Sequence, residues 1–268
     1  ELIDNLSTCR SPQGMDASLM VHHYVEEKKM PRENLFTVSV MPCVAKKFEA
    51  KRPELSHNGI QDVDAVITTS ELARMIKTAG IVFSELNEEA FDIPYGFSTG
   101  SAVIYGVTGG VSTAVVREAH YLLTGERIHD IPMEPVEGFP GLMSSSMTLP
   151  DGTEVKLGIV SGMKNVKNVI DAIKTGALHF DIVEVMACPG GCIGGGGQPI
   201  PNTTAERKKR TAGMHTSDKQ QPLRVARDNM LVKELYDKWL GETNSDIAHE
   251  YLHTHYYPRK KETEKELL

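Results

Sequence analysis

The chain has 268 residues, of which 40% are hydrophobic and 24% charged, so it is long enough for a large core in one or two domains. Its net charge of −7 gives no indication of a nucleic-acid partner, and we expect none. Four cysteines are too few for a disulfide framework in a chain of this size, and they favour a reducing compartment, here the cytoplasm.

Strands and helices are expected to alternate along most of the chain. The expected strands are residues 35–41, 63–68, 155–161 and 181–186, and the expected helices are residues 15–28, 70–79, 108–123 and 165–174. Thr69 and Ser70 are the expected cap of the second helix. This alternation predicts an α/β fold with a largely parallel sheet.

Residues 93–116 carry no charged side chain and resemble a membrane span in that respect alone. They contain Pro94 and many Gly, Ser and Thr residues, which make them too polar for a bilayer. We expect a buried loop followed by the start of a core helix, and no membrane span.

Two Met-x-Cys motifs each follow a predicted strand. One is M-P-C at Met41–Cys43, and the other is M-A-C at Met186–Cys188, which continues as P-G-G-C-I-G-G-G-G-Q-P through Cys192. Ligands of open α/β sheets collect at the carboxyl ends of strands, so the two motifs are expected to converge. Three thiolates suit zinc, Cu(I) or an iron–sulfur cluster, and the glycines let backbone approach a bulky inorganic group.

Two alternatives to a cluster remain at this point. A reduced, half-buried pair of structural cysteines explains Cys188 and Cys192 but leaves Cys43 unexplained. An ordinary zinc site usually has a second pair of cysteines or a closely spaced pair of histidines beside the first, and the motifs contain neither. The iron–sulfur interpretation is therefore favoured.

These segments resemble iron-only (FeFe) hydrogenases. M-P-C-V-A-K-K-F-E and E-V-M-A-C-P-G-G-C-I-G-G-G-G-Q-P are similar to the second and third motifs of that family. L-S-T-C-R-S-P-Q, D-A-V-I-T-T-S-E-L-A and G-V-T-G-G-V extend the similarity over nearly the whole chain. The resemblance implies lobes of parallel sheet flanked by helices around a buried iron–sulfur cluster.

The resemblance also implies a cofactor, a 4Fe-4S cluster joined through a cysteine to a two-iron unit that carries CO and cyanide. Cys43, Cys188 and Cys192 match three of the four cluster ligands, and Cys192 matches the bridging one. Lys46 matches the lysine that donates a hydrogen bond to a cyanide, a buried anion that needs a cationic donor.

Other family positions are matched singly. The matches that line the two-iron unit or its pocket are Met41, Met186, the backbone of Pro42, Ser11 and Gln13, and Ser7 matches a serine on the proton path. Methionine is also common as core filler, so a packing role stays open for the two methionines.

Two departures from the family pattern stand out. The first motif, T-S-C-C-P, which supplies the fourth ligand and a proton-shuttling cysteine, is expected upstream of residue 1, and Cys9 occupies a position that the family does not use as a ligand. Tyr105 stands where a phenylalanine is usual, and its hydroxyl needs a partner.

The expected domains are a catalytic domain over residues 1–203 and a helical extension over 204–268 that resembles the small-subunit region. Helices are expected over residues 229–239 and around 247–252, and the charge run at 206–210 is expected to be a solvated helix face. The implied function is reversible H2 oxidation and proton reduction, served by ferredoxin-like or nicotinamide-linked electron-transfer subunits and by maturation proteins. A non-catalytic iron–sulfur assembly homologue and a gas-sensing member are the alternatives.

Overall fold

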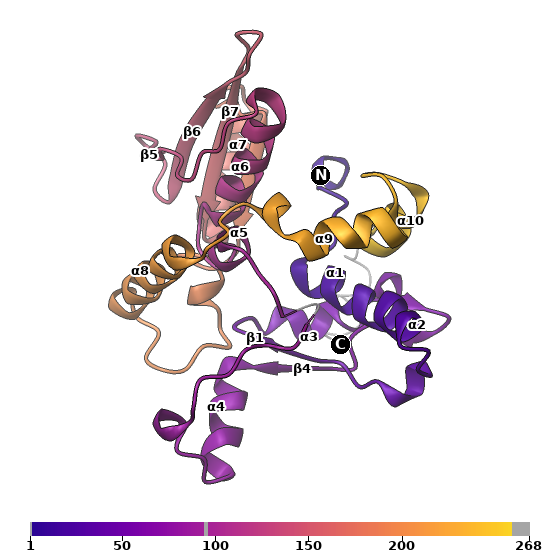
Figure 1. The fold of residues 1–268 in the computed structure, drawn as a ribbon. Coiled ribbons are helices and arrows are strands. Elements are labelled where there is room, and N and C mark those ends of the chain that lie inside the picture. Colours follow the sequence, from indigo (N-terminus) through magenta and orange to yellow (C-terminus); the bar gives the residue numbers. More distant parts are fainter. Residues whose placement is uncertain (1, 94–95, 259–268) are drawn as a thin grey trace. The chain divides into compact units, whose positions relative to one another are not determined.

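A computed structural model describes residues 2–93 and 96–258, which form two compact units (Figure 1). The first unit contains the residues up to Met41, Ala45–Ile67 and the residues from Glu234 on, and the second contains Pro42–Val44 and Thr68–Lys233. Within the described ranges, every helix is too short or too polar to cross a membrane.

The second unit is built on a four-stranded sheet in the order β5-β6-β7-β8 (Figure 1). Its strands are β5 (Glu134–Pro135), β6 (Leu142–Thr148), β7 (Glu154–Ser161) and β8 (Ile182–Met186). The β5/β6 and β6/β7 pairs are antiparallel, and the β7/β8 pair is parallel. The α/β mixture is confirmed, but the prediction of a largely parallel sheet is wrong for this sheet, because β6 joins β7 through a short turn instead of a helical crossover.

Helices pack against both faces of β7. Ile159 and Val160 are fully buried, and successive strand residues point to opposite faces of a sheet. Val160 packs with Val169 of one helix, and Ile159 packs with Val116 of the other. These two helices are α7 (Met163–Lys174) and α6 (Gly110–Thr124). The core that they form fixes β8 and the loop that follows it.

Further helices complete the second unit. They are α4 (Thr69–Thr78), α5 (Gly100–Ile104), α8 (Thr204–Gln220) and the first residues of α9 (Met230–Leu235). The cap of α4 is Thr68, one residue before the predicted pair Thr69 and Ser70. The Thr68 hydroxyl accepts the Glu71 N–H at 3.2 Å, and the Glu71 carboxylate accepts the Thr68 N–H at 2.6 Å, which is a reciprocal capping box.

The first unit joins residues from both ends of the chain. Its elements are α1 (Pro12–Leu19), a π-helical turn (Met20–Tyr24), α2 (Val25–Glu27), β1 (Val38–Met41), α3 (Ala45–Glu49), β2 (Ser56–His57), β3 (Ile60–Gln61), most of β4 (Ala65–Thr68), a second π-helical turn (Tyr236–Leu240) and α10 (Asp246–Leu252). Leu240 and Leu252 pack with Met15 and Leu19, so the first and last helices share a core.

Some predicted elements differ in detail. The helix over 15–28 and the helix over 229–239 are each interrupted by a π-helical turn. The buried loop expected from residue 93 is wrong at Ile93 and Phe97, whose side chains are exposed, whereas Thr99 is buried beside α5. Residues 94 and 95 of that prediction lie outside the described residues.

Candidate functional site

Three cysteines belong to the second unit, at the ends of two strands. Cys43 lies two residues after β1, Cys188 lies two residues after β8, and Cys192 begins a short 3-10 turn. Cys43 and Cys188 are half-buried, and Cys192 is exposed. All four cysteines of the chain are described, and none is in a disulfide.

Backbone contacts bring the two Met-x-Cys segments together. The Gly197 N–H donates to the Pro42 carbonyl at 2.9 Å. A Cβ atom on Gly195 would lie 2.1 Å from that same oxygen and 3.0 Å from the Cys192 carbonyl oxygen. The residue before Cys43 and the residue Cys192 therefore lie against the same glycine. We name residues 188–197 the cysteine loop.

The G-V-T segment packs against the other side of the cysteine loop. The Ile193 N–H donates to the Gly106 carbonyl at 3.0 Å, and the Thr108 N–H donates to the Gly190 carbonyl at 3.2 Å. Gly191 has φ +92°, and a Cβ there would lie 2.8 Å from the Thr108 nitrogen. Only glycine fits both this conformation and this contact. Tyr105, half-buried at the end of α5, precedes the segment.

A buried carboxylate in the middle of β8 fixes the strand to α6. Glu184 accepts the N–H groups of Gly109 and Ser112, each at 2.7 Å, at the start of that helix. A negative charge is favourable at a helix N-terminus, where amide N–H groups lack helical partners. The sequence reasoning did not identify Glu184, although an acidic residue inside an otherwise apolar strand is a detectable signal.

The charge run at residues 206–210 is only partly a solvated face. Arg210 donates to the Ile193 carbonyl at 3.1 Å and to the Asn202 side chain at 2.8 Å, and Arg207 donates to the Asn202 carbonyl at 2.8 Å. Asn202 in turn donates to the carbonyl of Gly194 at 3.1 Å. The prediction holds for Lys208 and Lys209, which are exposed, and is wrong for the two arginines, which hold the cysteine loop.

Several predicted site residues belong to the first unit and share one carboxylate there. Glu49 accepts a hydrogen bond from the Ser11 hydroxyl and pairs with the Lys46 ammonium at 2.6 Å. The side chains of Lys46 and Glu49 are 20% and 22% exposed, so the pair is largely shielded from water. This arrangement fixes the position of the Lys46 charge.

The remaining predicted residues have ordinary local contacts. Buried Gln13 accepts a hydrogen bond from Ser39 at 2.8 Å. Exposed Ser7 accepts the Cys9 N–H at 3.3 Å. Met41 ends β1, Met186 ends β8, and both are half-buried.

The donor set of the three cysteines is compatible with an iron–sulfur group. Thiolates are the ligands that iron–sulfur clusters use. The contacts at Gly191 and Gly195 leave no room for a side chain between the segments that carry the cysteines.

Comparisons with known proteins agree with this chemistry. Residues 1–196 match the family model of the iron-only hydrogenase large subunit, C-terminal domain, and residues 204–259 match that of the iron hydrogenase small subunit. The chain is 44% identical, over 97% of its length and 44% of the relative's, to the NADP-reducing hydrogenase subunit HndD of Solidesulfovibrio fructosivorans.

Two further likenesses bear on the choice of function. A solved FeFe-hydrogenase from Chlamydomonas reinhardtii superposes with a TM-score of 0.85 at 34% identity, covering 95% of this chain and 71% of the other. Protein NAR1 of Arabidopsis thaliana is 31% identical over 98% of this chain and 58% of its own. The chain spans about half the length of the curated hydrogenases that it matches.

Proposed function

Because the chain belongs to the iron-only hydrogenase family, we propose that it is the catalytic part of an enzyme that interconverts H2 with protons and electrons. The observation that carries the proposal is the contact of Pro42 and Cys192 with the same glycine, which joins the two cysteine segments. When bound, the 4Fe-4S cluster and its two-iron CO/cyanide unit supply the electron relay and the centre where the H–H bond forms or breaks.

The chain's own residues supply ligation and a shaped surrounding. Cys43, Cys188 and Cys192 would hold the cluster, with Cys192 at the junction to the two-iron unit. Thiolate ligation and the hydrogen bonds around it tune the potential of such clusters. A fourth thiolate would come from a segment that carries T-S-C-C-P.

Residues matched by family motif take supporting roles in this proposal. Lys46 would donate to a cyanide, as a charge already positioned by Glu49. Met41, Met186, Pro42 and Tyr105 would line the two-iron unit, with Ser11 and Gln13 in the same pocket and Ser7 on the proton path. The proposed division is a catalytic domain over 1–203 and a helical extension over 204–268.

Partners and compartment follow from the same chemistry. Electrons would pass to or from a ferredoxin-like or nicotinamide-linked subunit, and maturation proteins would install the two-iron unit. Thiols without disulfides suit the cytoplasm.

A non-catalytic assembly protein is the second candidate, because assembly-type relatives share the cysteine pattern. The identity of 44% to a hydrogenase subunit against 31% to NAR1 favours the enzyme. The match of Lys46 to the cyanide-binding lysine favours it as well.

The deciding measurement is infrared spectroscopy of the chain matured anaerobically with a polypeptide that carries T-S-C-C-P. We expect CO and cyanide bands together with hydrogen evolution. Cys192→Ser should remove the bands and the turnover, and Cys9→Ser is the matched control that should keep both. A fully active Cys192→Ser variant would contradict the ligand assignment, and a protein with an EPR-visible cluster but no CO or cyanide bands would favour the assembly role.

A further inference from the structure

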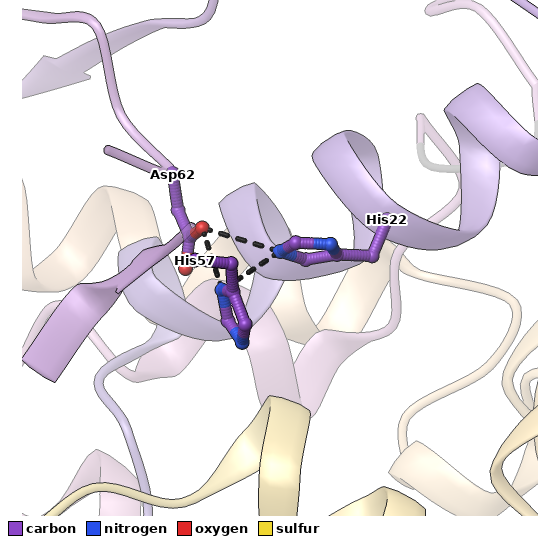
Figure 2. Close-up of side chains that lie close together, drawn as sticks. All are labelled: His22, His57 and Asp62. Atoms are coloured by element: carbon purple, nitrogen blue, oxygen red, sulfur yellow. Dashed lines mark hydrogen bonds and ion pairs between the residues drawn. The ribbon is translucent and has the colours of Figure 1, made fainter. Parts of the chain in front are cut away.

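Three potential ligands from separate segments of the first unit point toward one another (Figure 2). His22 lies on the π-helical turn, His57 ends β2, and Asp62 follows β3. His22 Nε2 lies 2.8 Å from His57 Nδ1 and 3.3 Å from Asp62 Oδ1, and His57 Nδ1 lies 3.1 Å from the same oxygen. We name these three residues the histidine cluster.

Hydrogen bonds alone cannot satisfy all three edges of this triangle. If both imidazole nitrogens carry a proton and donate to Asp62, the two N–H groups face each other across 2.8 Å. If only one carries a proton, the lone pair of the other faces the carboxylate. One edge is therefore repulsive in every tautomer, whereas a cation between the three atoms makes every edge favourable.

The spacing also suits coordination. Zinc–nitrogen and zinc–oxygen bonds of about 2.0–2.1 Å in a tetrahedron place neighbouring ligand atoms roughly 3.3 Å apart. The three observed separations of 2.8, 3.1 and 3.3 Å approach that value. Imidazole and carboxylate together are a ligand set that zinc accepts readily.

Asp62 is held ready as a carboxylate. Its side chain is 3% exposed, and its other oxygen accepts from Arg10 at 2.9 Å. A hydrogen-bonded outer partner of this kind typically orients a metal-ligating carboxylate.

The imidazoles keep access to solvent. The side chains of His22 and His57 are 21% and 20% exposed, and the His57 ring stacks on Tyr251 at 5.4 Å between centroids. π-Helical turns such as the one that carries His22 occur often at functional sites, because the extra residue re-aims a side chain. The cluster therefore has three candidate protein ligands, and its two imidazoles are reached by solvent.

We propose that His22 Nε2, His57 Nδ1 and Asp62 Oδ1 bind one divalent transition-metal ion of the zinc type. The ion would fasten the π-helical turn to the β2–β3 hairpin within the first unit. This site is separate in chemistry from the cysteine loop and does not depend on the proposed function.

The test is zinc loading of the full chain after it has been reconstituted with iron and sulfide together with the polypeptide that carries T-S-C-C-P. Zinc sulfate is added, loosely held metal is removed by gel filtration, and zinc per chain and the zinc K-edge spectrum are measured. We expect one zinc per chain with a nitrogen/oxygen shell at about 2.0–2.1 Å, which differs from the roughly 2.3 Å of a thiolate site. The edge is specific to zinc, so cluster iron does not interfere.

Variants locate the ion. His22→Ala and His57→Ala should each reduce retained zinc at least tenfold, and His179→Ala, at an 80% exposed histidine of the second unit, should retain it. Melting curves without zinc check that the variants fold, and zinc should raise the melting temperature of the wild type and His179→Ala alone. The proposal would be overturned by less than one zinc per chain, by zinc bound only to sulfur, or by zinc retention that neither His22→Ala nor His57→Ala reduces. The histidine cluster would then be a hydrogen-bonded group only.

Discussion

The cysteine loop and the histidine cluster are both built to hold several ligand atoms in place, but they do so by different means. In the loop, backbone meets backbone: glycine carbonyls and amides contact Pro42 and the G-V-T segment, and the cysteine side chains project from that frame. In the histidine cluster, the contacts are between side chains, and buried Arg10 orients the carboxylate of Asp62. The loop should therefore be sensitive to added volume, and the cluster to changes of charge.

The largest effect is expected where the loop is tightest. Gly195→Ala places a Cβ 2.1 Å from the Pro42 oxygen, so the two cysteine segments must separate. We expect cluster iron and hydrogen evolution to fall to background, as measured by iron content and gas chromatography. Gly196→Ala is the matched control, because its nearest contact is 3.8 Å away and it should keep both. Equal behaviour of the two variants would show that close backbone approach does not build the site.

Asp218 is a buried carboxylate paired with two arginines, which stay charged over the whole pH range. It accepts from Arg117 at 2.8 Å and from Arg224 at 2.6 Å, and the side chains of Asp218 and Arg117 are 2% and 0% exposed. Asp218→Asn leaves Arg117 buried without its counter-charge and should lower the free energy of unfolding by about 3–5 kcal/mol. Urea denaturation measures this, with Asp171→Asn on α7 as a control that should leave the midpoint unchanged.

Acid should act in the same direction on both aspartates. Burial would raise the pKa of Asp218, but its hydrogen bonds from Arg117 and Arg224 lower it overall, and the pKa of Asp62 is lowered to about 2. The unfolded chain then binds more protons than the folded one. This part of the stability is present above about pH 4 and is lost as the pH falls toward the folded values. Asp218→Asn should weaken the dependence of the urea denaturation midpoint on pH between pH 4 and 2. An unchanged slope of midpoint against pH in this variant would contradict this account.

A smaller effect is expected from a charge in the first unit. Lys46→Asn removes the cation that pairs with Glu49 and, in the proposed function, a charge-assisted bond to cyanide of roughly 1.5–3 kcal/mol. Infrared spectra should show low occupancy of the two-iron unit, while EPR still shows the 4Fe-4S cluster. Lys51→Asn, at an exposed lysine, is the control. Full intensity of the CO and cyanide bands in Lys46→Asn would show that Lys46 serves only in the ion pair with Glu49.

The smallest effect concerns the hairpin that presents His57. Gly59 has φ +79° with nothing near its missing Cβ, so only conformation opposes a side chain there. Gly59→Ala should cost about 1 kcal/mol in the free energy of unfolding and leave zinc retention intact. Asn58→Gly, at the neighbouring residue with φ +52°, should be tolerated. Loss of zinc in Gly59→Ala would mean that the cluster needs this turn as strictly as the loop needs its glycines.

The strands and helices that are marked by a local pattern of apolar and turn residues were predicted from the sequence. Strands β7 and β8 and helix α7 lie within two residues of their predicted bounds, because apolar runs and turn residues mark them. Strand β6 was missed, since its three serines lower its hydrophobicity, and it forms by pairing along the whole of β7. The convergence of the Met-x-Cys segments was predicted from the ends of strands in one sheet, but the strands that they follow, β1 and β8, belong to two different sheets.

What sequence could not supply is contact between distant positions. His22 and Asp62 are 40 residues apart, and their meeting depends on how the π-helical turn and the β2–β3 hairpin pack. Arg210 looked like one of several surface charges, but α8 turns it toward the cysteine loop. All the roles proposed for the matched residues stay predictions, those of the three cysteines and Lys46 included.

Arg10 ties the beginning of the first unit to its end. It donates to the carbonyls of Glu250 and His253, 240 and 243 residues later in the chain, while the second unit is complete once Lys233 has been made. Domains tend to fold as they emerge from the ribosome, and long-range contacts form late. During synthesis the second unit, with its cysteine loop, is therefore finished while the first unit still waits for its last helix.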